Sequence, residues 1–66
     1  MKIILNGEPR ETAEAITIAA LLEQLNLAPQ RVAVEVNLDV IPRDQHARRV
    51  LKDGDRLEIV TLVGGG

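Results

Sequence analysis

Apolar side chains open the chain as a short run that ends at a turn signal. Residues 2–5 are mostly aliphatic and are followed by Asn6-Gly7, a dipeptide that accepts positive φ at both central positions of a tight hairpin. Residues 8–12 predict the returning strand, and Pro9 places it at a sheet edge because proline cannot donate to a ladder. The chain therefore begins with a β-hairpin.

A helical spacing replaces this pattern from residue 17 onward. Four apolar residues recur at i, i+3, i+4 and i+7 and so share one helical face, namely Ile18, Leu21, Leu22 and Leu25. Thr17 is suited to the N-cap, and Asn26 with Pro29 closes the segment. The pattern predicts one amphipathic helix of about two to three turns.

Strict alternation returns at Val32, Val34 and Val36, which predicts a strand with its valines on the core side. Residues 37–39 look like a turn into a short extended piece at 40–41, which Pro42 stops. The polar stretch 43–47 predicts a loop or a single helical turn.

The last third of the chain contains two further strand signals. Val50-Leu51 predicts a short strand, residues 52–55 are a turn around Gly54, and residues 56–62 predict the final strand. The order strand, strand, helix, strand, short middle section, strand favours an α+β fold, in which a mixed sheet of four to five strands packs on one helix.

Composition narrows the function. A chain of 66 residues has room for one domain and one small core, and the absence of aromatic residues leaves that core to aliphatic side chains. There is no cysteine, and the net charge is −2 without a basic stripe, so thiol chemistry is excluded and nucleic acid is not an expected partner. His46 is the only histidine and is expected at the surface. We therefore expect no catalytic residue and no metal site.

No apolar run approaches the roughly 18 residues that a membrane span needs, and the N-terminal run is too short for a signal peptide. The expected location is the cytoplasm, without a membrane partner.

Three consecutive glycines end the sequence. Gly64, Gly65 and Gly66 have no side chains, so they can form a flexible thread that enters a tunnel too narrow for other residues. A frayed terminus is the ordinary alternative. Because the glycines directly follow an apolar strand, we favour a functional tail at 64–66 on a domain at 1–63.

The motifs in their order resemble those of a known family. Asn6-Gly7 lies in the first hairpin, Val34-Glu35-Val36-Asn37 in the third strand, Ile41-Pro42-Arg43-Asp44 in the middle, Asp53-Gly54-Asp55 before the last strand, and Val63-Gly64-Gly65-Gly66 at the end. Over essentially its whole length the chain resembles the sulfur carrier proteins of thiamine biosynthesis, the ThiS family, which have the ubiquitin-like β-grasp fold.

The resemblance implies a non-enzymatic role. In that family an enzyme resembling ubiquitin-activating enzymes adenylates the terminal carboxylate with ATP, and cysteine-derived sulfur then displaces AMP to give a thiocarboxylate. Thiazole synthase takes this sulfur for the thiazole ring. By this resemblance Gly66 is the modified residue, Gly64 and Gly65 form its arm, ATP is consumed by the partner, and the carrier itself binds no cofactor.

Alternation along the last strand predicts a docking surface beside the tail. If Leu57 and Ile59 face the helix, then Val60 and Leu62 face outward, and with Ile4 from a neighbouring strand they form a candidate partner-binding patch.

Other charged groups are expected to have ordinary roles. The arginines 43, 48 and 49 are expected to form a solvated loop rather than an anion site, although a contact with a partner stays open. Asp39, Asp44, Asp53 and Asp55 are expected to serve turns.

Other functions remain open, including a more general thiocarboxylate donor and a ubiquitin-like conjugating modifier. A carrier for another pathway, such as the small subunit of molybdopterin synthase, has a similar fold and tail. A plain β-grasp interaction module needs no tail chemistry at all. The identity of the sulfur donor, the number of pathways served and the oligomeric state are not contained in the residues.

Overall fold

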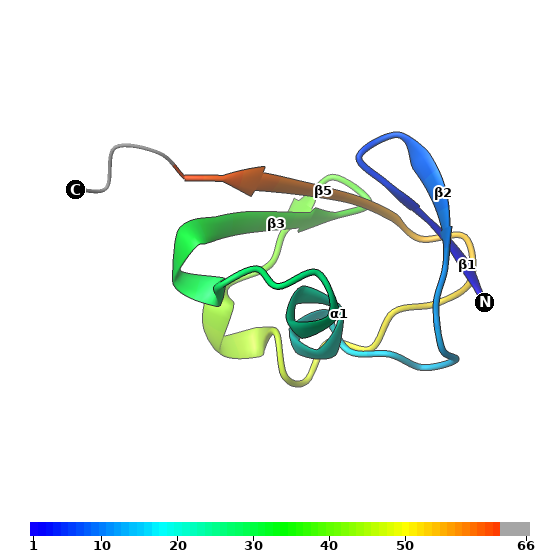
Figure 1. The fold of residues 1–66 in the computed structure, drawn as a ribbon, viewed down its shortest axis with the longest axis horizontal. Coiled ribbons are helices and arrows are strands. Elements are labelled where there is room, and N and C mark those ends of the chain that lie inside the picture. Colours follow the sequence, from blue (N-terminus) through cyan, green and yellow to red (C-terminus); the bar gives the residue numbers. More distant parts are fainter. Residues whose placement is uncertain (63–66) are drawn as a thin grey trace.

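The computed structural model describes residues 1–62, which form one mixed sheet and one helix (Figure 1). The elements are β1 (Lys2–Leu5), β2 (Glu8–Glu11), α1 (Ile18–Gln24), β3 (Val32–Val36), β4 (Asp39–Val40) and β5 (Arg56–Thr61), with 3₁₀ turns at Pro29–Arg31 and Arg43–Gln45. The strand order is β2-β1-β5-β3-β4; β1 and β5 are parallel and the other pairs are antiparallel. This confirms the predicted α+β fold and its opening hairpin.

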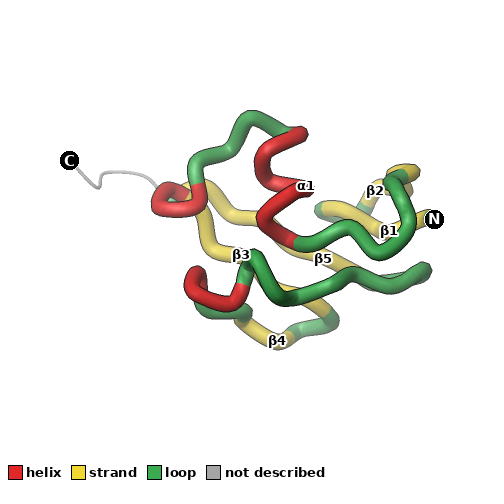
Figure 2. The backbone as a smooth tube through the Cα atoms, turned by 90° about the horizontal axis from the view of Figure 1, so that it is seen from below, coloured by secondary structure: helices red, strands yellow, loops and turns green. Residues whose placement is uncertain are grey.

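The core lies between α1 and one face of the sheet. Figures 1 and 2 show α1 against that face, while no described element covers the other face. The buried aliphatic residues come from the sheet, from the helix and from the connections between them. They are Ile3, Ile16, Ile18, Leu21, Leu22, Val32, Val34, Val36, Ile41, Leu51, Leu57 and Ile59. The predicted helical face and the alternating valines are therefore confirmed.

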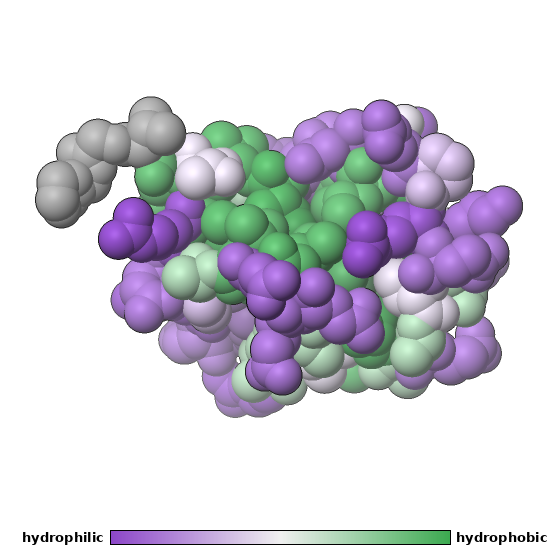
Figure 3. Space-filling model, viewed as in Figure 1, coloured by the Kyte–Doolittle hydropathy of each residue, from purple (hydrophilic) through white to green (hydrophobic). Residues whose placement is uncertain are grey.

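At one side the core reaches the surface. Leu5, Leu25 and Leu27 are half-buried and pack against it. Figure 3 shows hydrophobic residues gathered in the middle of the face seen in Figure 1, with hydrophilic residues around them. The helix is too short to enclose the core completely, because it has only seven residues.

The first N–H groups of α1 find hydrogen-bond acceptors in two parts of the chain. The Thr17 hydroxyl accepts a hydrogen bond from the Ala20 N–H at 3.1 Å, which confirms the predicted N-cap. The N–H groups of Ile18 and Ala19 donate to the carbonyl oxygens of Arg49 and His46, at 3.1 and 3.0 Å. A loop distant in sequence thus accepts hydrogen bonds that the first helical turn cannot make internally.

The expected strand at Val50-Leu51 is wrong. Val50 forms only an isolated bridge with Thr17, and the Leu51 N–H donates to the Ile16 carbonyl at 2.8 Å. The segment pairs with the chain that enters α1 rather than with the sheet, and Leu51 points into the core.

The expected surface position of His46 is also wrong, because only 4% of this residue is exposed. Its Nε2 lies 3.2 Å from the Ile41 carbonyl oxygen, so this nitrogen donates, whereas Nδ1 is buried without a partner. The side chain helps to hold the loop that caps α1.

Among residues 1–62, no helix has the length and hydrophobicity needed to cross a lipid bilayer.

Candidate functional site

Strand β5 divides its side chains between the core and the uncovered face of the sheet. Leu57 and Ile59 are buried, as the alternation predicted, while Glu58 is exposed. Val60 and Leu62 also point outward and are 57% and 52% exposed. Two large apolar side chains therefore lie in the solvent at the end of β5 that leads toward the C-terminus.

Ile4 lies on the same face but at the other end of β5. Its register partner is Arg56, and it is half-buried opposite Pro9 of β2. Arg56 and Val60 are four residues apart, which corresponds to roughly 13 Å along a strand. The structure thus brings Val60 and Leu62 together and places Ile4 at a distance from them.

Two asparagine side chains bind β5 from the neighbouring hairpins. The Asn6 Oδ1 accepts from the Ile59 N–H at 2.8 Å, and its Nδ2 donates to the Ile59 carbonyl at 3.3 Å. The Asn37 Oδ1 accepts from the Arg56 N–H at 3.0 Å, and the Asn37 N–H donates to the Arg56 carbonyl at 2.7 Å. Each side-chain amide thus bonds the backbone of β5 directly after the neighbouring strand, β1 or β3, has ended.

A polar network supports the start of β5. Asn37 Nδ2 donates to Asp55 Oδ1 at 3.0 Å, and Asp55 Oδ2 accepts from the Lys52 N–H at 2.8 Å. Asp53 Oδ1 accepts from the Lys2 N–H at 2.8 Å. The expectation that Asp53 and Asp55 serve a turn is confirmed, and Asp55 is buried as a result.

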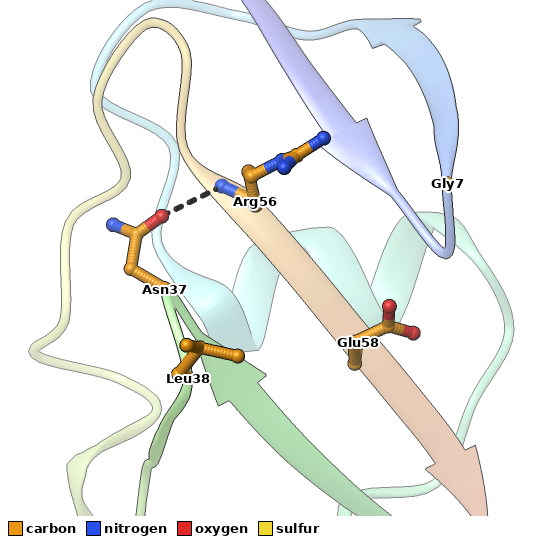
Figure 4. A pocket seen from close by; sticks show the side chains of 5 residues that line it. All are labelled: Gly7, Asn37, Leu38, Arg56 and Glu58. Carbon is orange, nitrogen blue, oxygen red and sulfur yellow. Dashed lines mark hydrogen bonds between the residues drawn. The ribbon is translucent and has the colours of Figure 1, made fainter.

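A hollow of about 440 Å³ lies on the uncovered face between the two hairpin turns (Figure 4). Its lining residues come from the β1–β2 turn, the β3–β4 turn and β5, namely Gly7, Asn37, Leu38, Arg56 and Glu58. Leu38 is a surface feature that the periodicity of the sequence did not predict. The sequence feature that could have revealed it is a leucine at the second position of a two-residue turn, where glycine is preferred.

The arginine-rich loop forms a separate surface. Arg48 and Arg49 line a hollow of about 320 Å³ with Gln45, and Arg48 Nη2 lies 3.4 Å from the Asp44 carbonyl oxygen. In the part of the chain that the structure describes, no carboxylate lies within ion-pair distance of Arg43, Arg48 or Arg49.

Metal binding has no counterpart among the described residues, where no three His, Asp or Glu side chains are grouped around a common point. Gly64, Gly65 and Gly66 lie outside the described residues, so the predicted tail remains a prediction.

Five strands in this order around a single helix define the ubiquitin-like β-grasp class of proteins. The crystal structure of the thiamine biosynthesis protein ThiS from Geobacter metallireducens superposes with a TM-score of 0.86, at 35% identity over 100% of both chains. The profile of the ThiS family matches residues 3–66. The chain belongs to the ThiS family.

Two curated relatives differ in length. The sulfur carrier protein ThiS of Escherichia coli (strain K12) is 32% identical over 100% of both chains. A thiazole synthase of Paramagnetospirillum magneticum is 44% identical over all 66 residues, yet the chain spans only 20% of that protein. The same family sequence thus matches both a small carrier and part of a longer protein that is named for thiazole formation.

Proposed function

We propose that this chain is a sulfur carrier whose Gly66 carboxylate becomes a thiocarboxylate that donates sulfur for thiazole formation in thiamine biosynthesis. The similarity to the Escherichia coli sulfur carrier over the full length of both chains carries the proposal. The similarity to a thiazole synthase supports the destination of the sulfur and favours this pathway over a molybdopterin-type carrier.

The proposed chemistry has two steps. A carboxylate oxygen of Gly66 attacks the α-phosphorus of ATP, so pyrophosphate leaves and an acyl-adenylate forms. Sulfide-level sulfur derived from cysteine and supplied by the donor then attacks the carbonyl carbon as HS⁻, AMP leaves with its bonding electron pair, and loss of the proton leaves the thiocarboxylate. Activation is required because the ionised carboxylate, with a reference pKa of about 3.3 to 3.7, has no good leaving group.

The partner enzymes supply the catalytic groups and the ATP site in this scheme. They are an adenylating enzyme that resembles ubiquitin-activating enzymes, a donor of cysteine-derived sulfur, and thiazole synthase. The carrier contributes a docking surface and a reactive carboxylate, with no metal or cofactor of its own. We propose the cytoplasm as the location of these ATP-dependent reactions.

The outward pair at the C-terminal end of β5 is the proposed docking patch for the adenylating enzyme. Val60 and Leu62 are exposed on a sheet face that no described element covers, and they lie next to residues 64–66 in sequence. An enzyme that bound both side chains would hold the carboxylate close to its active site.

Intact-mass measurement tests the proposed chemistry. The chain is incubated with ATP, the adenylating enzyme of the same organism and a cysteine-derived sulfur source. Exchange of one oxygen for sulfur adds roughly 16 Da. A chain without Gly66 is the control and should gain nothing. A wild-type mass that stays constant while the same enzyme modifies its known substrate would contradict the proposal.

A double substitution tests the docking patch. Val60→Asp with Leu62→Asp should leave the fold intact but slow adenylation at least tenfold, because two charges enter an apolar contact. Val50→Asp is the matched control, since Val50 is an exposed valine outside this sheet face. Adenylation of the double variant at the wild-type rate would remove the patch from the proposal.

A further inference from the structure

Leu38 has a backbone conformation that suits glycine. The β3–β4 hairpin turns at Asn37 and Leu38, whose φ angles are +52° and +75°. A side chain in the left-handed region costs roughly 1 to 2 kcal/mol, and asparagine tolerates the region better than leucine does. Two-residue turns of this type strongly favour glycine at the second position.

Burial does not offset this cost. Leu38 is 88% exposed, so its side chain gains almost nothing from the core. Val40, on the same hairpin, is 69% exposed and has Glu35 as its register partner on the uncovered face. A strained leucine and a valine, both largely in solvent, thus add little to the buried core.

Acidic groups lie next to these apolar side chains. Glu35 of β3 and Glu58 of β5 are register partners, and like charges directly opposite each other destabilise a sheet. Within residues 1–62 the only ion pairs join the Met1 ammonium to Glu11 and Glu14, so neither carboxylate is neutralised by a cation. Figure 4 shows the side chains of Arg56 and Glu58 at separate positions along β5. The side chain of Leu38, on the β3–β4 turn, is directed toward this strand.

The hollow between them is better suited to a protein than to a small molecule. A small-molecule site has convergent polar groups that are free to bind. Here Asn37 uses its Oδ1 and Nδ2 on Arg56 and Asp55. What remains in the hollow is the open apolar wall of Leu38, the Arg56 guanidinium and the Glu58 carboxylate, with Glu35 opposite Glu58 on the neighbouring strand.

We infer that this hollow and the Glu35–Glu58 pair at its edge are a second contact for the adenylating enzyme, which inserts an apolar side chain against Leu38 and a lysine or arginine between the two carboxylates. The inference rests on the proposed function. Glu58 and Val60 are successive outward residues of β5, and Glu58 is roughly 13 Å from Leu62, so one partner surface can span the hollow and the docking patch.

Leu38→Gly separates binding from folding. The variant relieves backbone strain, so its Tm should rise by about 3 to 6 °C. Its Kd for the adenylating enzyme, measured by calorimetry, and its KM in ATP–pyrophosphate exchange should both rise about tenfold, with kcat unchanged. A more stable protein that binds less well cannot owe the loss to misfolding. An unchanged Kd and KM would overturn the inference.

Charge is tested separately. Glu58→Gln should raise Kd about two- to fivefold and reduce its dependence on salt, because one carboxylate no longer attracts the basic side chain. Glu23→Gln on the exposed surface of α1 is the matched control and should leave Kd unchanged. Equal effects of the two substitutions would contradict the assigned contact.

Failure of the proposed function gives a different pattern. If the wild-type chain binds and is adenylated but Leu38→Gly behaves identically, only the second contact fails. If Leu38→Gly weakens binding while the wild-type chain is never adenylated, the contact stands and the sulfur-carrier chemistry fails. If the wild-type chain does not bind the enzyme, both proposals are overturned.

Discussion

The two hairpin turns of this protein use the same first residue and differ at the second. Asn6 and Asn37 both have positive φ, and both bind β5 through their side chains. Gly7 then completes one turn at φ +85°, whereas Leu38 completes the other at φ +75°. One turn therefore follows the preference of its backbone, while the other carries a strained side chain in solvent.

The two turns have similar backbone geometry, but their residues differ in what they contribute to the fold. The asparagines have a structural role, because without them β5 loses bonds at both of its flanks. Leu38 does nothing comparable, and a Cβ on Gly7 would meet no atom within 4 Å, so space alone does not explain the choice of glycine there. A binding role at Leu38 accounts for the contrast.

Loss of the core beneath both turns should have the largest effect. Leu22 is 1% exposed, and Leu22→Ala should lower the free energy of unfolding by about 2 to 5 kcal/mol. Urea denaturation measures this loss, with the exposed Glu23→Ala as control. Hydrogen exchange should accelerate at both turns, since both depend on one core; acceleration at only one would show that the turns are supported independently.

Removal of a turn amide should have the next largest effect. Asn6→Ala should cost about 2 kcal/mol, because the Ile59 N–H and carbonyl lose their partners. Asn26→Ala is a control for backbone strain, since Asn26 has a φ of +59° and no side-chain hydrogen bond among the described residues. The two variants should differ by at least 1 kcal/mol in urea denaturation, and equal losses would show that the amide contributes nothing.

Making the first turn resemble the second should cost less. Gly7→Leu introduces strain at φ +85°, and its Cβ would meet no atom within 4 Å, so we expect a loss of about 1 to 2 kcal/mol by thermal denaturation. A neutral result would mean that the backbone relaxes at little cost, and Leu38 would then no longer be a strained residue.

The reverse change should have the smallest effect and the opposite sign. Leu38→Gly should stabilise the fold by about 0.5 to 1 kcal/mol, since the relief of strain exceeds the entropy that glycine adds to the unfolded chain. Leu38→Ala should be nearly neutral, because it retains the Cβ. A destabilised Leu38→Gly would reveal a structural role for the leucine side chain.

Local patterns predicted the elements whose signals depend on periodicity or turn chemistry. Asn6-Gly7, the Leu21-Leu22 helical face and the outward Val60 are all visible in the residue order, because each follows from side-chain direction along a regular backbone. The two outward residues of the docking patch, Val60 in β5 and Leu62 directly after it, could be proposed in the same way.

Features that depend on tertiary contact could not be predicted. His46 is buried because the loop around it folds against α1, and Val50-Leu51 pairs with the segment before α1 rather than with the sheet. No spacing of residues in the sequence predicts the burial of His46 or the pairing of Val50-Leu51. The place of Asn37 against Arg56, 19 residues away, likewise depends on the β3–β5 register, and so does the hollow beside it.

The capping of α1 by a distant loop also constrains how the chain folds. An isolated helix of seven residues is unstable in water, and two acceptors for its first N–H groups come from His46 and Arg49, beyond β3 and β4. Helix formation must therefore wait for most of the chain to assemble. Refolding should be a single kinetic phase in which the helical circular dichroism signal and the burial of the core appear together, at a rate set by loop closure rather than by helix growth.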